Sequence, residues 1–148
     1  MRSRRAELSG WGRTAPSVAQ LVDAVDTELD ATTLADLAAS RGIIARGLGR
    51  AYGDPAQNGG GTVVQLRPGQ IVLDVARGEV TAGGGVGFDE LLRHLVPRGW
   101  FVPVTPGTRF ITVGGAVASD IHGKNHHVDG SFGAHLRSIT LLTADGER

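Results

Sequence analysis

The sequence predicts an α+β fold about the size of one domain, from three observations. The chain has 148 residues, of which 41% are hydrophobic, so it is long enough to bury one ordinary core. Its apolar residues follow helical spacing in some segments and strand-like runs in others. Its 23 glycines gather in clusters between those segments. Clustered glycine is typical of turns and close backbone approaches on a folded scaffold, so low-complexity disorder is not expected.

The first helix is predicted over residues 32–41, where Thr32 or Thr33 can cap the amino end and Gly42 can end the helix. A short strand follows in "GIIARGLG" and leads into a glycine turn. Two further segments, 62–66 and 71–84, are rich in β-branched residues and are expected to form strands. The second is expected to be a hairpin that turns at Arg77 and Gly78.

The clearest helix is predicted in "GFDELLRHLVPRG", residues 87–99. Its apolar face would consist of Phe88, Leu91, Leu92 and Leu95. An extended segment restricted by two prolines should follow in "WFVPVTPG".

The rest of the chain is expected to contain two strands. One would lie in "ITVGGAVAS", residues 111–119, and enter a turn of small residues. The other would lie in "LRSITLLTADGER", where Asp145 and Gly146 begin a hairpin turn as the sequence stops. Because a domain seldom ends inside a hairpin, the chain is expected to be a fragment that does not turn over substrate by itself.

Charge and composition exclude several classes of function. Fifteen basic and fifteen acidic residues give no net charge that would attract nucleic acid. Residues 1–9, which begin with the basic run "MRSRR", are expected to be a flexible N-terminus ahead of a domain over 10–148. The chain has no cysteine, which excludes disulfides and thiolate chemistry. The sequence also shows neither a signal peptide nor a membrane-spanning run.

Two glycine loops are candidates for binding phosphate. "GLGRAY" is not a dinucleotide fingerprint of the Rossmann type, because Tyr52 stands where the third glycine is needed, and the chain has no P-loop. "GLGRAYGD" and "TVGGAVASDIHG" remain, and each can present backbone N–H groups to an anion as a nest. The alternative is that they are only tight turns.

Several motifs carry a resemblance to a known family. "GWGRTAPS", "RGLGRAYGD" and the run from "PVTPGTRF" through "IHGKNHH" to "LLTADGE" resemble the decaprenylphosphoryl-β-D-ribose 2-oxidases, the FAD-containing subunits of an actinobacterial epimerase that makes the arabinose donor of the cell wall. These belong to the vanillyl-alcohol-oxidase type of flavoprotein. The resemblance implies a PCMH-type FAD-binding domain of two α/β subdomains, truncated before the substrate domain.

The resemblance also implies which residues contact the cofactor. They are Ala45, Arg46, Gly47, Leu48, Gly49, Arg50, Ala51, Tyr52, Gly53, Asp54 and Pro55 around the pyrophosphate, and Gly107, Thr112, Val113, Gly114, Gly115, Ser119, Asp120, Ile121 and His122 along the rest. Two positions depart from the family, where Asn is common in place of Pro55 and Cys is known in place of Ser119. Arg50 stands where related enzymes often carry a flavin-linked histidine, so the FAD is expected to be noncovalent.

The segment "DIHGKNHHVDGSFGAHL" (120–136) holds four of the five histidines and the only lysine, and has three possible interpretations. A metal site is not predicted, because glycine and asparagine interrupt the helix that His122 and His126 would need. The other two are a purely structural loop and a loop beside the flavin. In the latter, His122 touches the isoalloxazine region of the flavin, and Lys124 points into the substrate pocket as the candidate catalytic residue. The residues that would support the loop geometry are Asn125, His126, His127 and His135.

The function expected from the resemblance is oxidation of a polyprenyl-phospho-sugar by an FAD-dependent oxidoreductase, with a 2-keto product. Another sugar or alditol oxidase and a noncatalytic FAD-binding domain remain as alternatives. The expected partners are FAD, the lipid-linked sugar and the NADH-dependent reductase of the epimerase, with no nucleic acid. The expected location is the cytoplasm or the cell envelope, including the periplasm.

Overall fold

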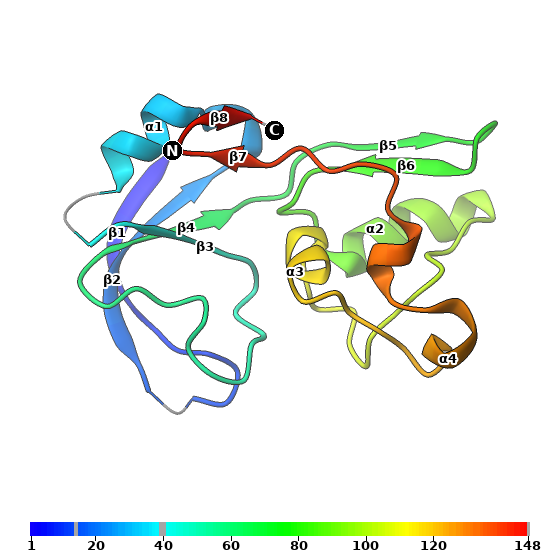
Figure 1. The fold of residues 1–148 in the computed structure, drawn as a ribbon, viewed down its shortest axis with the longest axis horizontal. Coiled ribbons are helices and arrows are strands. Elements are labelled where there is room, and N and C mark those ends of the chain that lie inside the picture. Colours follow the sequence, from blue (N-terminus) through cyan, green and yellow to red (C-terminus); the bar gives the residue numbers. More distant parts are fainter. Residues whose placement is uncertain (14, 39–40, 148) are drawn as a thin grey trace. The chain divides into compact units, whose positions relative to one another are not determined.

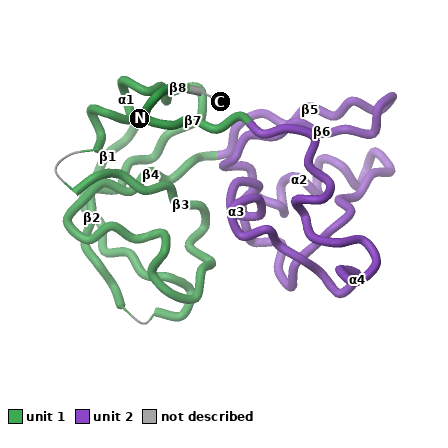
Figure 2. Tube along the Cα trace, viewed as in Figure 1, with its two compact units in different colours: residues 1–67, 140–148 green, residues 68–139 purple. Residues whose placement is uncertain are grey.

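The computed structural model describes residues 1–13, 15–38 and 41–147. The chain forms two compact units, which are coloured separately in Figure 2. Unit 1 consists of residues 1–67 and 140–148, and unit 2 of residues 68–139. Each unit has its own buried apolar clusters, two in unit 1 and one in unit 2 among the described residues.

Unit 1 is built on a four-stranded sheet in the order β1-β2-β4-β3 (Figure 1). The strands are β1 (Arg2–Leu8), β2 (Ser17–Ala24), β3 (Ile43–Arg46) and β4 (Thr62–Leu66). The edge strand β1 pairs antiparallel with β2, whereas β2, β4 and β3 run parallel. The predicted strands at 43–46 and 62–66 are therefore confirmed.

Both faces of this sheet are apolar, as expected for strands of a parallel sheet. Leu21 pairs with Val63, and the two lie in a cluster on one face with Ile44. Val22 pairs with Val64 on the opposite face, which packs against Leu29, Leu37 and other partly buried side chains. The helix α1 (Ala31–Leu37) contributes Leu37 and so covers this second face.

The N-terminus differs from the flexible segment that the sequence predicted for residues 1–9. Seven of these residues form β1, which pairs with β2 along its whole length. Ala6 and Leu8 pack against the sheet core, and Arg4 forms an ion pair with Asp23 on β2. The basic run concealed the strand, because exposed charged side chains are also typical of a sheet edge.

The amino end of α1 also differs from the sequence prediction. The cap is Asp30, whose carboxylate accepts from the N–H of Thr33 at 2.7 Å, rather than Thr32 or Thr33. The helix ends at Leu37, and residues 39–40 of the predicted span lie outside the described residues. Aspartate caps helices at least as well as threonine does. The sequence therefore offered several possible caps at 30–33, and the apolar spacing of the helix did not decide between them.

Unit 2 begins with a hairpin of β5 (Ile71–Asp74) and β6 (Glu79–Ala82), which is antiparallel as predicted. Gly78 has a φ of 64° in the connecting turn, a conformation that glycine adopts without strain. The predicted helix is also confirmed as α2 (Phe88–Leu95), followed by a 3-10 turn, η2 (Val96–Arg98).

The core of unit 2 forms around the apolar face of α2. Phe88 is fully buried, and its ring centroid lies 5.6 Å from that of Phe132. The buried members of this core are Val86, Phe88, Leu91, Leu95, Val102, Val104, Ala116 and Phe132. Val102 and Val104 of the segment after α2, and Phe132 farther along the chain, complete the core that α2 starts and so fix those segments against the helix.

The strand predicted over 111–119 is wrong, because residues Val113–Ala118 form the helix α3. The side chain of Thr112 caps this helix by accepting from the N–H of Gly115 at 3.0 Å. Two glycines and two valines gave a poor helix propensity, and the cap and the buried Ala116 outweigh it.

Two short helical turns follow α3 in unit 2. They are α4 (His126–Asp129) and the 3-10 helix η3 (Phe132–His135). In unit 1, the predicted final strand is reduced to a hairpin of two-residue strands, β7 (Leu142–Thr143) and β8 (Gly146–Glu147). Gly146 already lies in the second strand, so the turn is one residue earlier than predicted. Across the described residues, none of the helices has the length and apolarity to span a membrane.

Glu28 links three parts of unit 1 through its carboxylate. It accepts from the backbone N–H of Val25 at 2.9 Å, and it forms ion pairs of 3.1 Å with the amino group of Met1 and with Arg67. The Val25 hydrogen bond and then the amino group of Met1 lower the pKa of Glu28 from 4.5 to about 2. The carboxylate therefore favours the folded state above the unfolded pKa, and this contribution is lost as pH falls from about 4.5 to about 2.

We predict that Glu28→Gln lowers the urea midpoint of unfolding at pH 7 and has a progressively smaller effect as the pH approaches 2. Glu7→Gln is the matched control, since Glu7 is exposed on the edge strand. Unfolding followed by circular dichroism at pH 7, 5, 4 and 3 tests this. A difference between wild type and Glu28→Gln that stays constant with pH would contradict it.

Candidate cofactor site

In unit 1, the loop after β3 is held by the guanidinium group of Arg46, the last residue of that strand. Its Nη1 donates to the carbonyl of Ala56 at 3.0 Å, and its Nη2 donates to the carbonyl of Ser9 at 2.7 Å. A Cβ at Gly49, which has a φ of 66°, would collide with this guanidinium. Glycine at 49 therefore lets the loop fold closely around Arg46.

A second segment, the turn Ser9–Arg13 that follows β1, lies against the same loop. Trp11 N–H donates to the carbonyl of Ala51 at 2.7 Å, and Gly12 N–H donates to that of Tyr52 at 3.2 Å. The rings of Trp11 and Tyr52 meet edge to face, with centroids 5.4 Å apart. A Cβ at Gly10 would overlap the carbonyl oxygen of Gly53, so only glycine permits this approach.

These two segments border an open hollow of about 400 Å³. The hollow is lined by Ser9, Gly10, Trp11, Arg13, Arg46, Leu48, Gly49 and Arg50. Three of the lining residues are arginines, and none is acidic, so we call this space the arginine hollow. Burial lowers the pKa of Arg46, because its charged form loses hydration there. The hollow is therefore suited to an anion.

In unit 2, the amino end of α3 uses its own N–H groups within the protein. The N–H of Val113 donates to Val86 O and that of Gly114 to Gly84 O, each at 2.8 Å. The N–H of Gly115 donates to the Thr112 hydroxyl, as described above. These N–H groups are therefore not free to form an anion nest, contrary to the sequence expectation for this loop. Gly114 instead serves packing, since a Cβ there would lie 3.0 Å from Gly84 O.

The histidine-rich loop after α3 is fixed at its start by Asp120. This residue has a φ of 40°, which is uncommon outside glycine. Its Oδ1 accepts from the N–H of Gly133 at 2.8 Å. The Gly133 N–H, followed by the Ser131 side chain and the nearby His122, lowers the pKa of the Asp120 carboxyl. Asp120 thus closes the loop into a ring between α3 and η3.

The middle of the loop rests on the segment 103–105. A Cβ at Gly123 would lie 2.5 Å from the carbonyl oxygen of Thr105, so glycine is required at this crossing. Asn125 donates through Nδ2 to the carbonyl of Pro103 at 3.0 Å and to Asp129 at 2.7 Å. Lys124, between these two anchors, is exposed. The backbone that carries the lysine is therefore held on both sides.

The histidines of the loop are exposed, and the described residues contain no group of three or more histidine, aspartate or glutamate side chains that could hold a metal. The rings of His122 and His126 are 5.6 Å apart, and His126 begins the one-turn helix α4, which the sequence did not predict. His135 Nε2 lies 2.9 Å from the carbonyl oxygen of Asp129 and so supports the loop.

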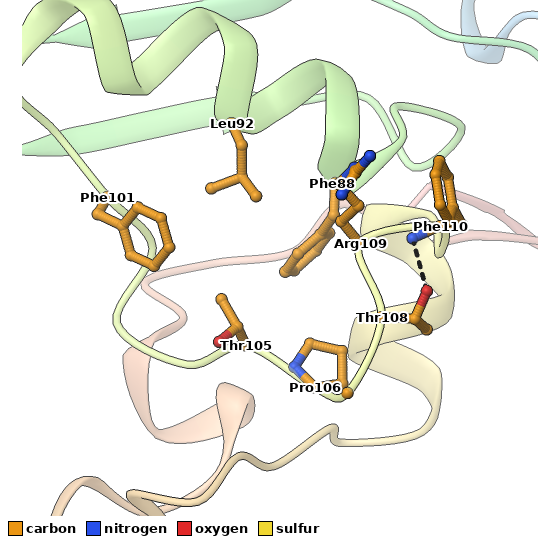
Figure 3. A pocket seen from close by; sticks show the side chains of 9 residues that line it. Phe88, Leu92, Phe101, Thr105, Pro106, Thr108, Arg109 and Phe110 are labelled. Atoms are coloured by element: carbon orange, nitrogen blue, oxygen red, sulfur yellow. Dashed lines mark hydrogen bonds between the residues drawn. The ribbon is translucent and has the colours of Figure 1, made fainter.

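A second hollow, of about 380 Å³, lies entirely in unit 2 between α2 and residues 101–110. In Figure 3, Leu92 and Phe88 on the helix and Phe101, Thr105 and Pro106 on the loop line this hollow. The dashed line marks the hydrogen bond from Phe110 N–H to the Thr108 hydroxyl at 3.1 Å. Gly107 is the one residue assigned to the cofactor that lines this hollow.

The residues assigned to the cofactor fall into both units, 45–55 in unit 1 and the others in unit 2. In unit 1, Arg46, Leu48, Gly49 and Arg50 line the arginine hollow, whereas Tyr52, Gly53, Asp54 and Pro55 do not. The turn Ser9–Arg13 was not among the assigned residues. Its signal was present in "GWGR", where two glycines flank a tryptophan before an arginine, but nothing in the sequence indicated which loop the turn would contact.

A profile described as "FAD binding domain" matches residues 19–148. The chain belongs to this FAD-binding domain family. Its fold agrees, because a cholesterol oxidase from Brevibacterium sterolicum has a TM-score of 0.62 at 15% identity, over 82% of this chain and 25% of that one. An aclacinomycin oxidoreductase has a TM-score of 0.61 at 21% identity, over 88% and 27%. The PCMH-type fold class predicted from the sequence is confirmed.

Two curated relatives are similar in sequence. Decaprenylphosphoryl-beta-D-ribose oxidase of Mycolicibacterium smegmatis is 52% identical over 144 residues, which is 95% of this chain and 31% of the relative. Alditol oxidase of a Streptomyces species is 32% identical over 95 residues, 64% of this chain and 23% of the relative. The chain thus spans less than a third of the length of these proteins.

The arginine hollow fits the cofactor of this family. FAD contains a diphosphate, which carries negative charge and needs close access to N–H donors. Arg46 uses two of its N–H groups on backbone carbonyls, and a guanidinium has five. Its remaining donors and the guanidinium groups of Arg13 and Arg50 give the hollow the charge that a diphosphate requires.

We predict that Asp120→Ala speeds hydrogen exchange at the Gly133 amide, because that N–H loses its acceptor. Asp120→Asn is the matched control, since asparagine retains the Oδ1 acceptor and tolerates a positive φ. Amide exchange measured by NMR should therefore order the variants as wild type, Asn and Ala, with Ala fastest. Equal protection in all three would show that the Asp120 carboxylate does not hold the loop.

Proposed function

We propose that the protein carrying this chain is an FAD-dependent oxidoreductase that oxidises the 2-hydroxyl of decaprenylphosphoryl-β-D-ribose to the 2-keto product. The observation that carries this proposal is the 52% identity, over 95% of the chain, to a relative named for oxidising that sugar. The two fixed loops and the arginine hollow support it, because they match the needs of a large anionic cofactor.

In this proposal the residues of unit 1 hold the diphosphate, and residues 107, 112–115 and 119–122 of unit 2 lie along the remainder of the cofactor. FAD, when bound, supplies a two-electron acceptor for the oxidation of an alcohol to a ketone. The contributions of the chain are binding and orientation. The close approach at Gly10 and the cap at Thr112 fix the backbone of both parts before any ligand binds.

Lys124 is the candidate for contact with the substrate. It is the only lysine of the chain and lies between the two anchors at Gly123 and Asn125. An ammonium group on a fixed backbone can attract a phosphorylated sugar and stabilise negative charge that develops on the oxygen being oxidised. Because the contacts of Gly123 and Asn125 hold the backbone on both sides of Lys124, less conformational freedom has to be lost when its ammonium group contacts a ligand.

A second candidate is oxidation of another sugar or alditol, favoured by the 32% identity to alditol oxidase. For the first candidate, the product would enter cell-wall arabinan synthesis after reduction by an NADH-dependent partner, in or near the cell envelope. The two candidates differ in substrate, so the full-length protein carrying this sequence separates them. Reduction of its flavin absorbance under anaerobic conditions by the phospho-ribose, and not by free alditols, supports the first.

We predict that the FAD is bound noncovalently. Arg50 cannot form the histidine linkage found in related enzymes, and the chain has no cysteine. Acid precipitation of the FAD-loaded chain should release all yellow colour to the supernatant. Flavin fluorescence on the denatured band in a gel would contradict this.

We predict that Lys124→Ala in the full-length protein lowers kcat by about tenfold or more, because an oriented charge near the reacting atoms is lost. The FAD content should stay near that of wild type. Lys124→Arg is the control, since it keeps the charge and should retain more activity than Lys124→Ala. Stopped-flow measurement of flavin reduction provides the rate, and an unchanged rate in Lys124→Ala would assign the lysine to the surface.

A further inference from the structure

We propose that the turn Ser9–Arg13 is the second wall of a diphosphate site in unit 1, and that Arg13 binds the diphosphate directly. This inference rests on the proposed FAD binding and adds to it a segment outside the glycine loop. The ligand chemistry is a diphosphate, whether it belongs to FAD or is free pyrophosphate.

The first step is that the turn has a fixed position on the glycine loop. Two backbone hydrogen bonds, from Trp11 and Gly12, reach the carbonyls of Ala51 and Tyr52. Gly10 is buried and has no room for a Cβ. The turn and the loop therefore form one surface rather than two independent segments.

The second step is that Arg46 connects the turn to the start of the loop. Its guanidinium bonds the carbonyl of Ser9 on one side and that of Ala56 on the other. Because these acceptors are neutral carbonyls, neither bond neutralises the charge of Arg46. A partly buried cation of this kind gains from an anion in the same hollow.

The third step concerns the backbone of Arg13, which has a φ of 53°. A left-handed conformation is uncommon for residues other than glycine, asparagine and aspartate, and it has a cost in stability. Such strain is found most often at binding and catalytic sites. In this conformation Arg13 lines the hollow with Arg46 and Arg50.

The fourth step is the charge of the hollow. Three guanidinium groups of like charge line a space of about 400 Å³, and none of the described residues that line it is acidic. A diphosphate in this space would be attracted by the positive charges, and the Arg13 guanidinium can donate two parallel hydrogen bonds to phosphate oxygens. Contacts of this type make Arg13 a determinant of affinity for the diphosphate and not for the flavin ring.

The test is isothermal titration of the 148-residue chain with FAD and, separately, with inorganic pyrophosphate. Arg13→Gly removes the guanidinium and fits the positive φ better than arginine does, so it should fold. We expect Arg13→Gly to lower the affinities for FAD and for pyrophosphate by a similar factor, about tenfold or more. Arg13→Lys keeps the charge without the forked donors and should lie between Arg13→Gly and wild type.

Arg5→Gln is the matched control, because it removes one exposed positive charge from the same unit away from the hollow. It should leave both affinities within about twofold of wild type, and circular dichroism should show all variants folded. Affinities of Arg13→Gly that match those of Arg5→Gln would overturn the inference and leave the proposed FAD binding intact. So would failure of wild type to bind pyrophosphate while it binds FAD. Pyrophosphate binding that depends on Arg13, with no FAD binding by wild type, would support the diphosphate site and refute the proposed function.

Discussion

The backbone contact between Gly10 and residues 51–53 is the constraint on which the arginine hollow depends. A side chain at position 10 would occupy the space of the Gly53 carbonyl, which would separate the turn from the loop. Arg46 could then no longer bond both Ser9 and Ala56. The hollow therefore arises because glycine lets two segments that are distant in the sequence meet through their main chains, and charged side chains line the space between them.

The glycine loop at the start of α3 in unit 2 has a different role. At α3 the first-turn N–H groups are satisfied by Val86 O, Gly84 O and the Thr112 hydroxyl, and Gly114 packs against Gly84. This arrangement stabilises a short helix of poor propensity and attaches it to the core through Ala116. The contribution of the second loop to the proposed site is thus shape and position, whereas that of the first loop is charge.

The sequence predicted those elements in which one signal dominates. The spacing of Phe88, Leu91 and Leu95 identified α2, and the turn at Gly78 identified the hairpin of β5 and β6. Both signals are local, because the spacing of apolar residues and the residues of a turn depend only on neighbours in the sequence. It failed at α3 and at β1, where distant contacts decide the outcome. The cap at Thr112 competes with the β-branched character of the segment, and β1 is defined by its pairing with β2 rather than by its basic side chains.

The same limit explains what could be predicted of the candidate site. Both glycine loops were found because glycine clusters are visible in any sequence, but a cluster does not show whether its N–H groups face a ligand or a neighbouring strand. The surrounding residues distinguish the two cases here. "GLGR" is directly preceded by Arg46, ends in Arg50 and has no capping threonine. "TVGGA" begins with a threonine cap, and Arg109, three residues before that cap, is not adjacent to the glycines. A glycine loop flanked by arginine is therefore the stronger candidate for an anion, because fixed charge is available even where every backbone donor is already used. The turn Ser9–Arg13 could not be added by this reasoning, since its arginine reaches the hollow only through pairing between segments more than thirty residues apart.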